Sequence, residues 1–437
     1  MSTREPHSMH LADAAVAMAQ GEQSARGIAD AQLARIAATD AGVGAWAHLD
    51  ADHVRVCADR CDAVPASGRG ALHGIGVGVK DIIATAEYPT EMGSPVFAGN
   101  RIAADAECVV RLKRCGGYVF GKTVTTELAY FHPGKTRNPW NPQHTPGGSS
   151  SGSAAAVAAG HVAAAIGTQT NGSMIRPAAF CGVVGFKPTK DTIPRGGVNV
   201  FSDTLDQIGT FGRGVADAAR LAGVMADAGR IAVDPQSSTA PPKLALLRQY
   251  PWTRAPDPAA AEALDTCVAR LRGQGATVTL VEIPEAFRSV DRVHRTIMMF
   301  EGGANLGALQ DRERARLSIE LNAALDEGRA ITQADYEEAL RRRIACIECF
   351  TEWHAPFDAV LSPPAAGPAP EGITATGDPS CCTLYSLVGF PALTLPVGRA
   401  RNGLPLGMQI ATSAGTDDRL LAVAAWCEAR LPFAGLV

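Results

Sequence analysis

Two short loops rich in glycine and serine carry the residues of this chain best suited to nucleophilic chemistry. The first contains Ser149 in the stretch TPGGSSSGS, and the second ends at Ser173 in the stretch GTQTNGS. Serine supplies a hydroxyl nucleophile, and glycine lets backbone N–H groups approach a ligand without steric obstruction. A small-residue helix over 154–159 and an apolar strand over 161–167 connect the loops, so we expect the two hydroxyls to meet.

The second loop is suited to stabilising negative charge. We take Ser173 as the nucleophile because it ends this loop. The backbone N–H groups of Thr170, Asn171, Gly172 and Ser173 can point together at a developing oxyanion. If each serine is considered without the surrounding pattern, Ser149 is interpreted as a helix cap and Ser173 as a turn residue.

The longer pattern resembles the amidase signature family of Ser-Ser-Lys hydrolases, and it is closest in motif to malonamidase-like and small-molecule amidases. Its segments are GGSSSGSAAA, GTQTNGSMIRPAAFCG, GKTVTTELAYF, NPWNP, GFPALTLPVG and GLPLGMQI, which span most of the chain. The family's lysine context matches the sequence GVKD, which contains Lys80. The resemblance implies that Lys80 is the base, that Ser149 relays protons and follows a cis peptide bond, and that Ser173 forms the acyl-enzyme. It implies neither a metal nor a cofactor.

Lys80 can act as a base only if its amine is neutral. A free lysine has a pKa near 10.4, so burial must lower the pKa by roughly 3 units. The apolar, glycine-containing strand expected over 76–83 provides such a setting. Ser150 is open to two interpretations, a hydrogen bond to this lysine or a helix cap.

The chain departs from the pattern GTDTGGSIR of many relatives. Gln169 replaces the acid, Asn171 replaces a glycine, and the arginine comes one residue later, at Arg176. Asn171 tolerates unusual backbone angles, and its side chain is expected to narrow the pocket. Arg176 either binds a substrate carboxylate or pairs with a carboxylate of its own chain and braces the loop. Tyr130, in the segment GKTVTTELAYF, is a second candidate substrate contact.

Three rival motifs are poorer matches. The stretch 116–123 fits a P-loop formally, but a helix precedes it and apolar residues fill its loop positions. The stretch 148–152 reads G-x-S-x-G, but a Pro/Gly loop precedes it where a nucleophile elbow needs a strand. Cys346 and Cys349 form a C-x-x-C without a second ligand pair, which favours a helix-buried pair over a metal site.

Composition limits the classes of partner and compartment. The chain has 437 residues, 46% of them hydrophobic, and a net charge of −4 with no basic run. We therefore expect a small-molecule amide or carbamate substrate, no nucleic acid and no membrane. The N-terminus lacks a continuous apolar segment, and the eleven cysteines have no repeated spacing, which is typical of a cytoplasmic protein with reduced thiols.

The elements predict an α/β fold, a three-layer α/β/α sandwich with a large mixed, mostly parallel central β-sheet. We expect a single domain over 1–437, in which the largely helical region 241–357 is variable and covers the active site. Within it, a helix over 259–273 is flanked by strands over 243–247 and 276–281.

The predicted function is hydrolysis of the C–N bond of a small linear amide through an acyl-enzyme. One alternative is a urethanase-like hydrolase of carbamates or urea derivatives that uses the same three residues. An alternative of another class is the A-type glutaminase component of a tRNA-dependent amidotransferase complex. A homodimer is compatible with each of these functions.

Overall fold

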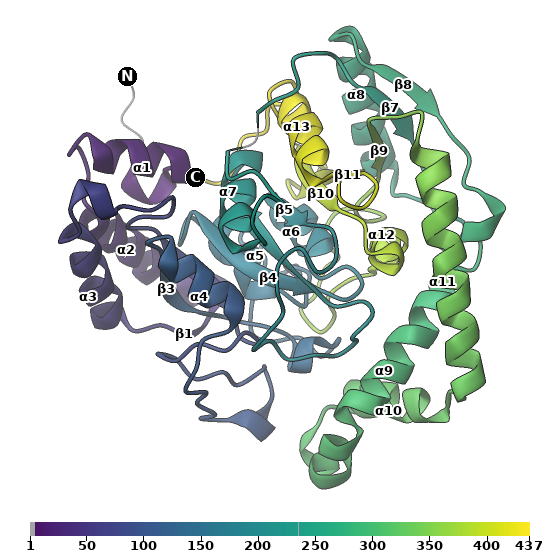
Figure 1. Cartoon of the computed structure of the whole chain (residues 1–437), viewed down its shortest axis with the longest axis horizontal. Coiled ribbons are helices and arrows are strands. Elements are labelled where there is room, and N and C mark those ends of the chain that lie inside the picture. Colours follow the sequence, from purple (N-terminus) through teal and green to yellow (C-terminus); the bar gives the residue numbers. More distant parts are fainter. Residues whose placement is uncertain (1–4, 235) are drawn as a thin grey trace.

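One eleven-stranded sheet forms the centre of the protein. The computed structural model describes residues 5–234 and 236–437, and Figure 1 shows helices on both sides of the sheet. Every residue of the inner strands β2 to β6 is buried, so both faces of the sheet are covered there. The predicted three-layer architecture is confirmed. In spatial order the strands are β1 (Trp46–His48), β3 (Tyr118–Thr123), β2 (Gly76–Lys80), β4 (Ala164–Gln169), β6 (Gln207–Gly212), β5 (Val184–Lys187), β10 (Ala392–Arg399), β11 (Pro405–Ala411), β9 (Ala359–Ser362), β7 (Lys243–Leu246) and β8 (Thr277–Leu280).

The sheet is mixed, as expected, but the expectation that it is mostly parallel is wrong. Six of the ten strand pairings among the described residues are antiparallel and four are parallel. Strands β10 and β11 form a hairpin whose turn contains Asn402 and Gly403, the latter with φ +81°. Such a short connection can join only antiparallel strands.

Helices pack on the sheet and extend beyond it. In Figure 1, α9, α10 and α11 form a long helical arm beside the sheet. No helix among the described residues combines the length and apolar character needed to cross a membrane. The helices are α1 (Leu11–Ala19), α2 (Ala25–Val43), α3 (Ala51–Asp62), α4 (Glu107–Arg114), α5 (Ser151–Ala158), α6 (Ile175–Cys181), α7 (Val215–Met225), α8 (Pro258–Gly273), α9 (Val290–Glu313), α10 (Ile319–Ala330), α11 (Gln333–His354), α12 (Thr383–Val388) and α13 (Asp417–Glu428).

The parallel pair β2 and β4 brings the two ends of the sequence motif together. Gly78 pairs with Ala165 and Val79 pairs with Ile166. The carboxyl ends of parallel strands lie at the same edge of a sheet. Lys80, the last residue of β2, therefore lies beside the end of β4, where the loop to Ser173 begins.

Close packing fixes the start of α5 against the neighbouring strand β3. The N–H of Gly152 donates to the carbonyl of Val124 at 2.9 Å, and Ser153 Oγ lies 2.7 Å from Thr123 Oγ1. A Cβ atom at position 152 would lie 2.3 Å from the carbonyl oxygen of Ala45 and 2.3 Å from the nitrogen of Val124. Only glycine fits this approach of two backbone segments.

We therefore expect Gly152→Ala to lower the free energy of unfolding by about 3 kcal/mol, because the backbone on both sides must move. Denaturant unfolding followed by circular dichroism measures this change. The control is Gly273→Ala at the end of α8, where a Cβ meets no atom within 4 Å. Better helix propensity there should raise stability by about 0.5–1 kcal/mol. Equal unfolding midpoints for Gly152→Ala and the wild type would contradict the packing argument.

Candidate active site

Lys80 is fully buried and reaches two hydroxyl groups. Its Nζ lies 2.7 Å from Ser149 Oγ and 2.8 Å from Thr168 Oγ1. Burial lowers the pKa of Lys80 to about 7, although the charge of Asp206 acts in the opposite direction. At neutral pH a large fraction of this amine is thus unprotonated, and its lone pair can accept a proton from Ser149.

Ser149 lies in the turn just before α5. The peptide bond between Gly148 and Ser149 is cis, as the resemblance implies. The Ser149 carbonyl accepts a hydrogen bond from the N–H of Thr126 at 3.3 Å, and the Gly148 carbonyl accepts one from Arg176 Nη2 at 2.6 Å. The main chain on both sides of Ser149 is therefore held by hydrogen bonds.

Ser150 takes neither of the two roles expected for it. Its Oγ donates to the carbonyl of Thr168 at 3.1 Å and accepts from the N–H of Thr168 at 3.3 Å. Ser150 stands at the N-cap position of α5, but its side chain makes no capping hydrogen bond to the helix. Ser150 thus ties the turn to the end of β4, and so it places Thr168 beside Lys80.

Ser173 and Ser149 line the same cavity, although no hydrogen bond joins them directly among the described residues. The cavity has a volume of about 30 Å³ and is partly open to solvent. The wall consists of Thr126, Ala129, Tyr130, Phe131, Ser149, Thr170, Asn171, Gly172, Ser173, Arg176, Phe201, Met298, Thr376 and Pro379.

The loop before Ser173 presents unused backbone donors. Within residues 5–234 and 236–437, the N–H groups of Asn171, Gly172 and Ser173 make no hydrogen bond to a protein acceptor. The Thr170 carbonyl, in contrast, accepts from His294 Nε2 at 3.0 Å. Burial lowers the pKa of His294 to about 4, so this ring is neutral and its Nε2–H donates.

Gln169 holds both ends of the same loop. Its Oε1 accepts from the N–H groups of Met174 at 2.7 Å and Ile175 at 3.1 Å, at the start of α6. Its Nε2 donates to Ser386 Oγ at 2.9 Å, and Ser386 donates in turn to the carbonyl of Asn171. An aspartate at position 169 could accept the first two hydrogen bonds but could not donate the third.

Arg176 is a buried brace, but the carboxylate partner expected for it is not present among the described residues. It donates to the carbonyls of Gly148 at 2.6 Å and Gly377 at 2.8 Å, and to Thr376 Oγ1 at 3.1 Å. Burial lowers its pKa to about 10, so it remains charged at neutral pH. Arg176 links the turn that carries Ser149 to the loop over 376–377.

Aromatic and apolar side chains close the other side of the cavity. The ring of Tyr130 stacks on that of Phe201, with centroids 5.2 Å apart. Met298 of α9 lines the same wall. Tyr130 thus lies where a substrate contact was predicted, and one residue of the region 241–357 reaches the cavity.

Sequence reasoning missed several residues of the site. Asp206 accepts from Thr170 Oγ1 at 2.6 Å and from the N–H of Phe201 at 2.7 Å, which joins the loop to the aromatic wall. His294 and Met298 are four residues apart and share one face of α9. In the sequence, only this four-residue spacing could have pointed to the two residues. The sequence does not show that this face of α9 contacts the loop before Ser173.

The rival motifs do not form ligand sites. The last six residues of the P-loop match are strand β3, and all are buried. No strand lies directly before Gly148, as a nucleophile elbow requires. Cys346 lies within α11, and its Sγ donates to the carbonyl of Ala286 at 3.5 Å.

A low lysine pKa alone does not identify the site. Burial also lowers the pKa of Lys187 to about 7, but its Nζ donates to the carbonyl of Phe390. Lys122 is buried 3.0 Å from Asp81. Of these three buried lysines, only Lys80 contacts a serine hydroxyl.

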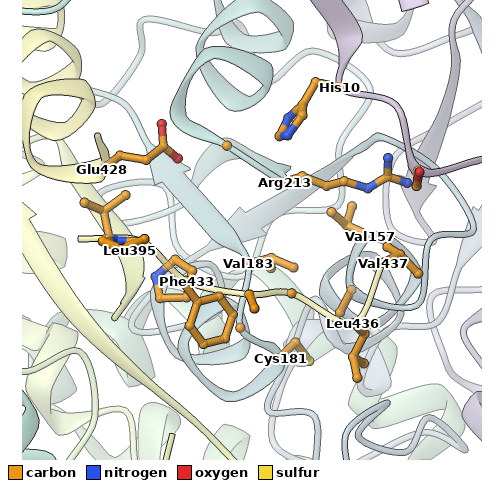
Figure 2. A pocket seen from close by; sticks show the side chains of 18 of the residues that line it. His10, Val157, Cys181, Val183, Arg213, Leu395, Glu428, Phe433, Leu436 and Val437 are labelled. Atoms are coloured by element: carbon orange, nitrogen blue, oxygen red, sulfur yellow. The ribbon is translucent and has the colours of Figure 1, made fainter. Parts of the chain in front are cut away.

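A larger cavity of about 680 Å³ lies between the two ends of the chain (Figure 2). Its charged side chains serve the fold. Arg213 donates to the carbonyl of Met9 at 2.6 Å, and Glu428 accepts from the N–H of Val215 at 2.9 Å. None of the predicted site residues lines this cavity.

A comparison with known families agrees with this arrangement of a lysine and two serines at the edge of the sheet. The family model described as Amidase matches residues 28–421. The chain belongs to the amidase family.

Individual relatives cover nearly the whole chain. The A-type subunit of the glutamyl-tRNA(Gln) amidotransferase of Synechococcus sp. (strain WH7803) is 33% identical over 95% of this chain and 96% of that protein. A crystal structure of an amidase has a TM-score of 0.88 and 28% identity, covering 97% of this chain and 100% of that one. The native peptide amidase of Stenotrophomonas maltophilia has a TM-score of 0.82 and 29% identity over 97% of each chain. The curated relatives support the amidotransferase alternative better than the free-standing amidase.

We expect Arg176→Gln to lower activity equally on neutral and carboxylate-bearing amides, because the guanidinium holds backbone carbonyls. It should also lower the free energy of unfolding by about 3 kcal/mol, at about 1 kcal/mol for each hydrogen bond. Steady-state kinetics on matched amides and thermal unfolding measure the two effects. A higher KM for carboxylate-bearing amides only, at unchanged stability, would instead assign Arg176 to substrate binding.

Proposed function

We propose that this protein is a serine amidase that hydrolyses small, neutral amides, with Ser173 as nucleophile, Lys80 as base and Ser149 as proton relay. The observation that carries the proposal is the 2.7 Å contact between Lys80 Nζ and Ser149 Oγ in a fully buried site that opens on Ser173. Lysine burial of this kind is costly, and the use of Lys80 as a base beside its proton relay accounts for it.

The reaction runs in two halves. Neutral Lys80 takes the proton of Ser149 while Ser149 takes that of Ser173, and Ser173 Oγ attacks the carbonyl carbon. The N–H groups of the loop that ends at Ser173 stabilise the resulting oxyanion, and the nearby charge of Arg176 adds to this field. Ser149 then gives a proton to the leaving nitrogen and is reprotonated by Lys80, so the C–N bond breaks and the amine departs. Water attacks the acyl-enzyme by the same proton route and releases the acid.

The cavity wall favours a neutral substrate. Arg176 is the only charged side chain among the residues that line it, and its hydrogen bonds go to its own chain. Phe131, Phe201 and Met298 are apolar. An ionised ammonium group would lose its hydration here and would meet no acidic side chain among the described residues that line the cavity. Neutral carbamates and urea derivatives meet the same requirement and would carbamoylate Ser173.

The second candidate is the glutaminase component of an amidotransferase complex, and the observation that favours it is the 33% identity to such a protein over 95% of the chain. In that case the protein would act with partner subunits and deliver ammonia to a reaction on tRNA. Glutamine carries an ammonium group, for which the described residues that line the cavity offer no acidic partner.

The pH profile tests the base. Lys80 accepts a proton only when neutral, so kcat/KM should rise as the pH increases through about 7 and then level off. Lys80→Met should lower kcat by about 10²- to 10⁴-fold and abolish this rise. Lys187→Met is the matched control, because Lys187 has the same lowered pKa but contacts no serine. The proposal fails if Lys80→Met keeps the wild-type profile.

Substrate competition separates the two candidate functions. We expect kcat/KM for a neutral anilide to exceed that for L-glutamine by about 100-fold or more, because desolvation of an unpaired ammonium group is unfavourable. Product release measured with the purified chain, alone and with added amidotransferase subunits and tRNA, gives the comparison. Fast glutamine hydrolysis that depends on those partners would establish the second candidate instead.

A further inference from the structure

Asn171 stands where many relatives have glycine, and the backbone conformation at position 171 does not explain why this chain has asparagine. The non-glycine residues with positive φ in the described chain are Met92, Leu128, Ala129 and Asp191, so Asn171 is not among them. A glycine at position 171 is therefore not required by the main chain, and the expected use of asparagine for an unusual backbone angle does not apply. The side chain itself needs a reason.

Helix α12 holds Asn171 at two points. Thr383 Oγ1 donates to Asn171 Oδ1 at 3.0 Å, and Ser386 Oγ donates to its carbonyl. Thr383 and Ser386 are both buried, and Gln169 Nε2 donates to Ser386 at 2.9 Å. These contacts fix the amide group, with its oxygen on the protein side.

The amide nitrogen of Asn171 is available to bind a ligand. Asn171 is partly exposed and lines the cavity that contains Ser149 and Ser173. With Oδ1 taken by Thr383, its Nδ2 carries two N–H groups that make no hydrogen bond within residues 5–234 and 236–437. An amide fixed at one end is a well-oriented donor at the other.

We propose that Asn171 is a specificity residue whose Nδ2 donates a hydrogen bond to a second neutral oxygen acceptor of the substrate, apart from the carbonyl that is attacked. The inference rests on the proposed function, since it assigns the substrate class of the same site. The preferred substrates are amides or carbamates with an ether, ester or carbonyl oxygen a few bonds from the scissile bond. Thr383 is a positioning residue that keeps the amide in this orientation.

Matched pairs in which one oxygen replaces one methylene test this assignment. On the acyl side the pair is methoxyacetanilide and butyranilide, and on the amine side it is N-(2-methoxyethyl)propionamide and N-butylpropionamide. The ratio of kcat/KM within each pair is compared between the wild type and Asn171→Leu, so that intrinsic reactivities cancel. We expect the ratio for at least one pair to fall on the order of ten-fold in Asn171→Leu.

Two variants of Thr383 separate specificity from general damage. Thr383→Val should lower the same ratio because it frees the amide, and Thr383→Ser should restore it. A Thr383 that served stability alone would change turnover of both members of a pair equally. Unchanged ratios for both pairs in Asn171→Leu would overturn the inference.

Labelling with a fluorophosphonate probe distinguishes failure of this inference from failure of the proposed function. If the probe labels Ser173 and turnover is lost in Ser173→Ala, unchanged ratios count against Asn171 alone. If Ser173 is not labelled and Ser173→Ala retains turnover, the proposed function and the inference that rests on it are both wrong.

Discussion

The exclusion of water from one lysine is the constraint on which the rest of the site depends. Lys80 is fully buried at the end of β2, and within the part of the chain that the structure describes its Nζ makes hydrogen bonds to the hydroxyls of Ser149 and Thr168 alone. A charged amine is poorly solvated there, and this lowers its pKa. The fully buried strands β2 to β4 and the tight approach of α5 at Gly152 keep this environment dry. Packing of the sheet thus determines the protonation state of Lys80.

Much of the fold could be predicted from local sequence patterns, but strands β5 and β6 and the antiparallel direction of most pairings could not. The predicted helix over 259–273 and its flanking strands correspond to α8, β7 and β8 within one residue or two. Strands β5 and β6 were not predicted, because β5 has only four residues and glycines interrupt both. Their positions between β4 and β10 depend on pairing across long sequence separations, which no local pattern encodes.

The motif predicted which residues gather at the site, and distant contacts determined how they are held. Lys80, Ser149 and the loop to Ser173 lie together, while their catalytic roles stay predictions. Spacing indicated that the two serine loops meet, and the family resemblance implied Lys80. Arg176 donates to backbone carbonyl groups of other loops. Such partners cannot be predicted from the sequence, because every residue has a backbone carbonyl. His294 reaches Thr170 across more than a hundred residues. A polar residue in a helix gives no indication of the carbonyl that it meets.

The cavity takes its two sides from different parts of the chain, and this has an evolutionary consequence. Lys80, Ser149 and Ser173 come from the first half of the chain, whereas Met298 belongs to α9. Met298 lies in a hydrophobic core that residues of α9 to α12 form together with first-half residues such as Ile175 and Phe201. Substitutions in α9 can reshape the wall without replacing the hydroxyls or the amine. The two halves can therefore diverge at different rates, and new substrate ranges can arise by drift in one half while the reaction chemistry is inherited unchanged in the other.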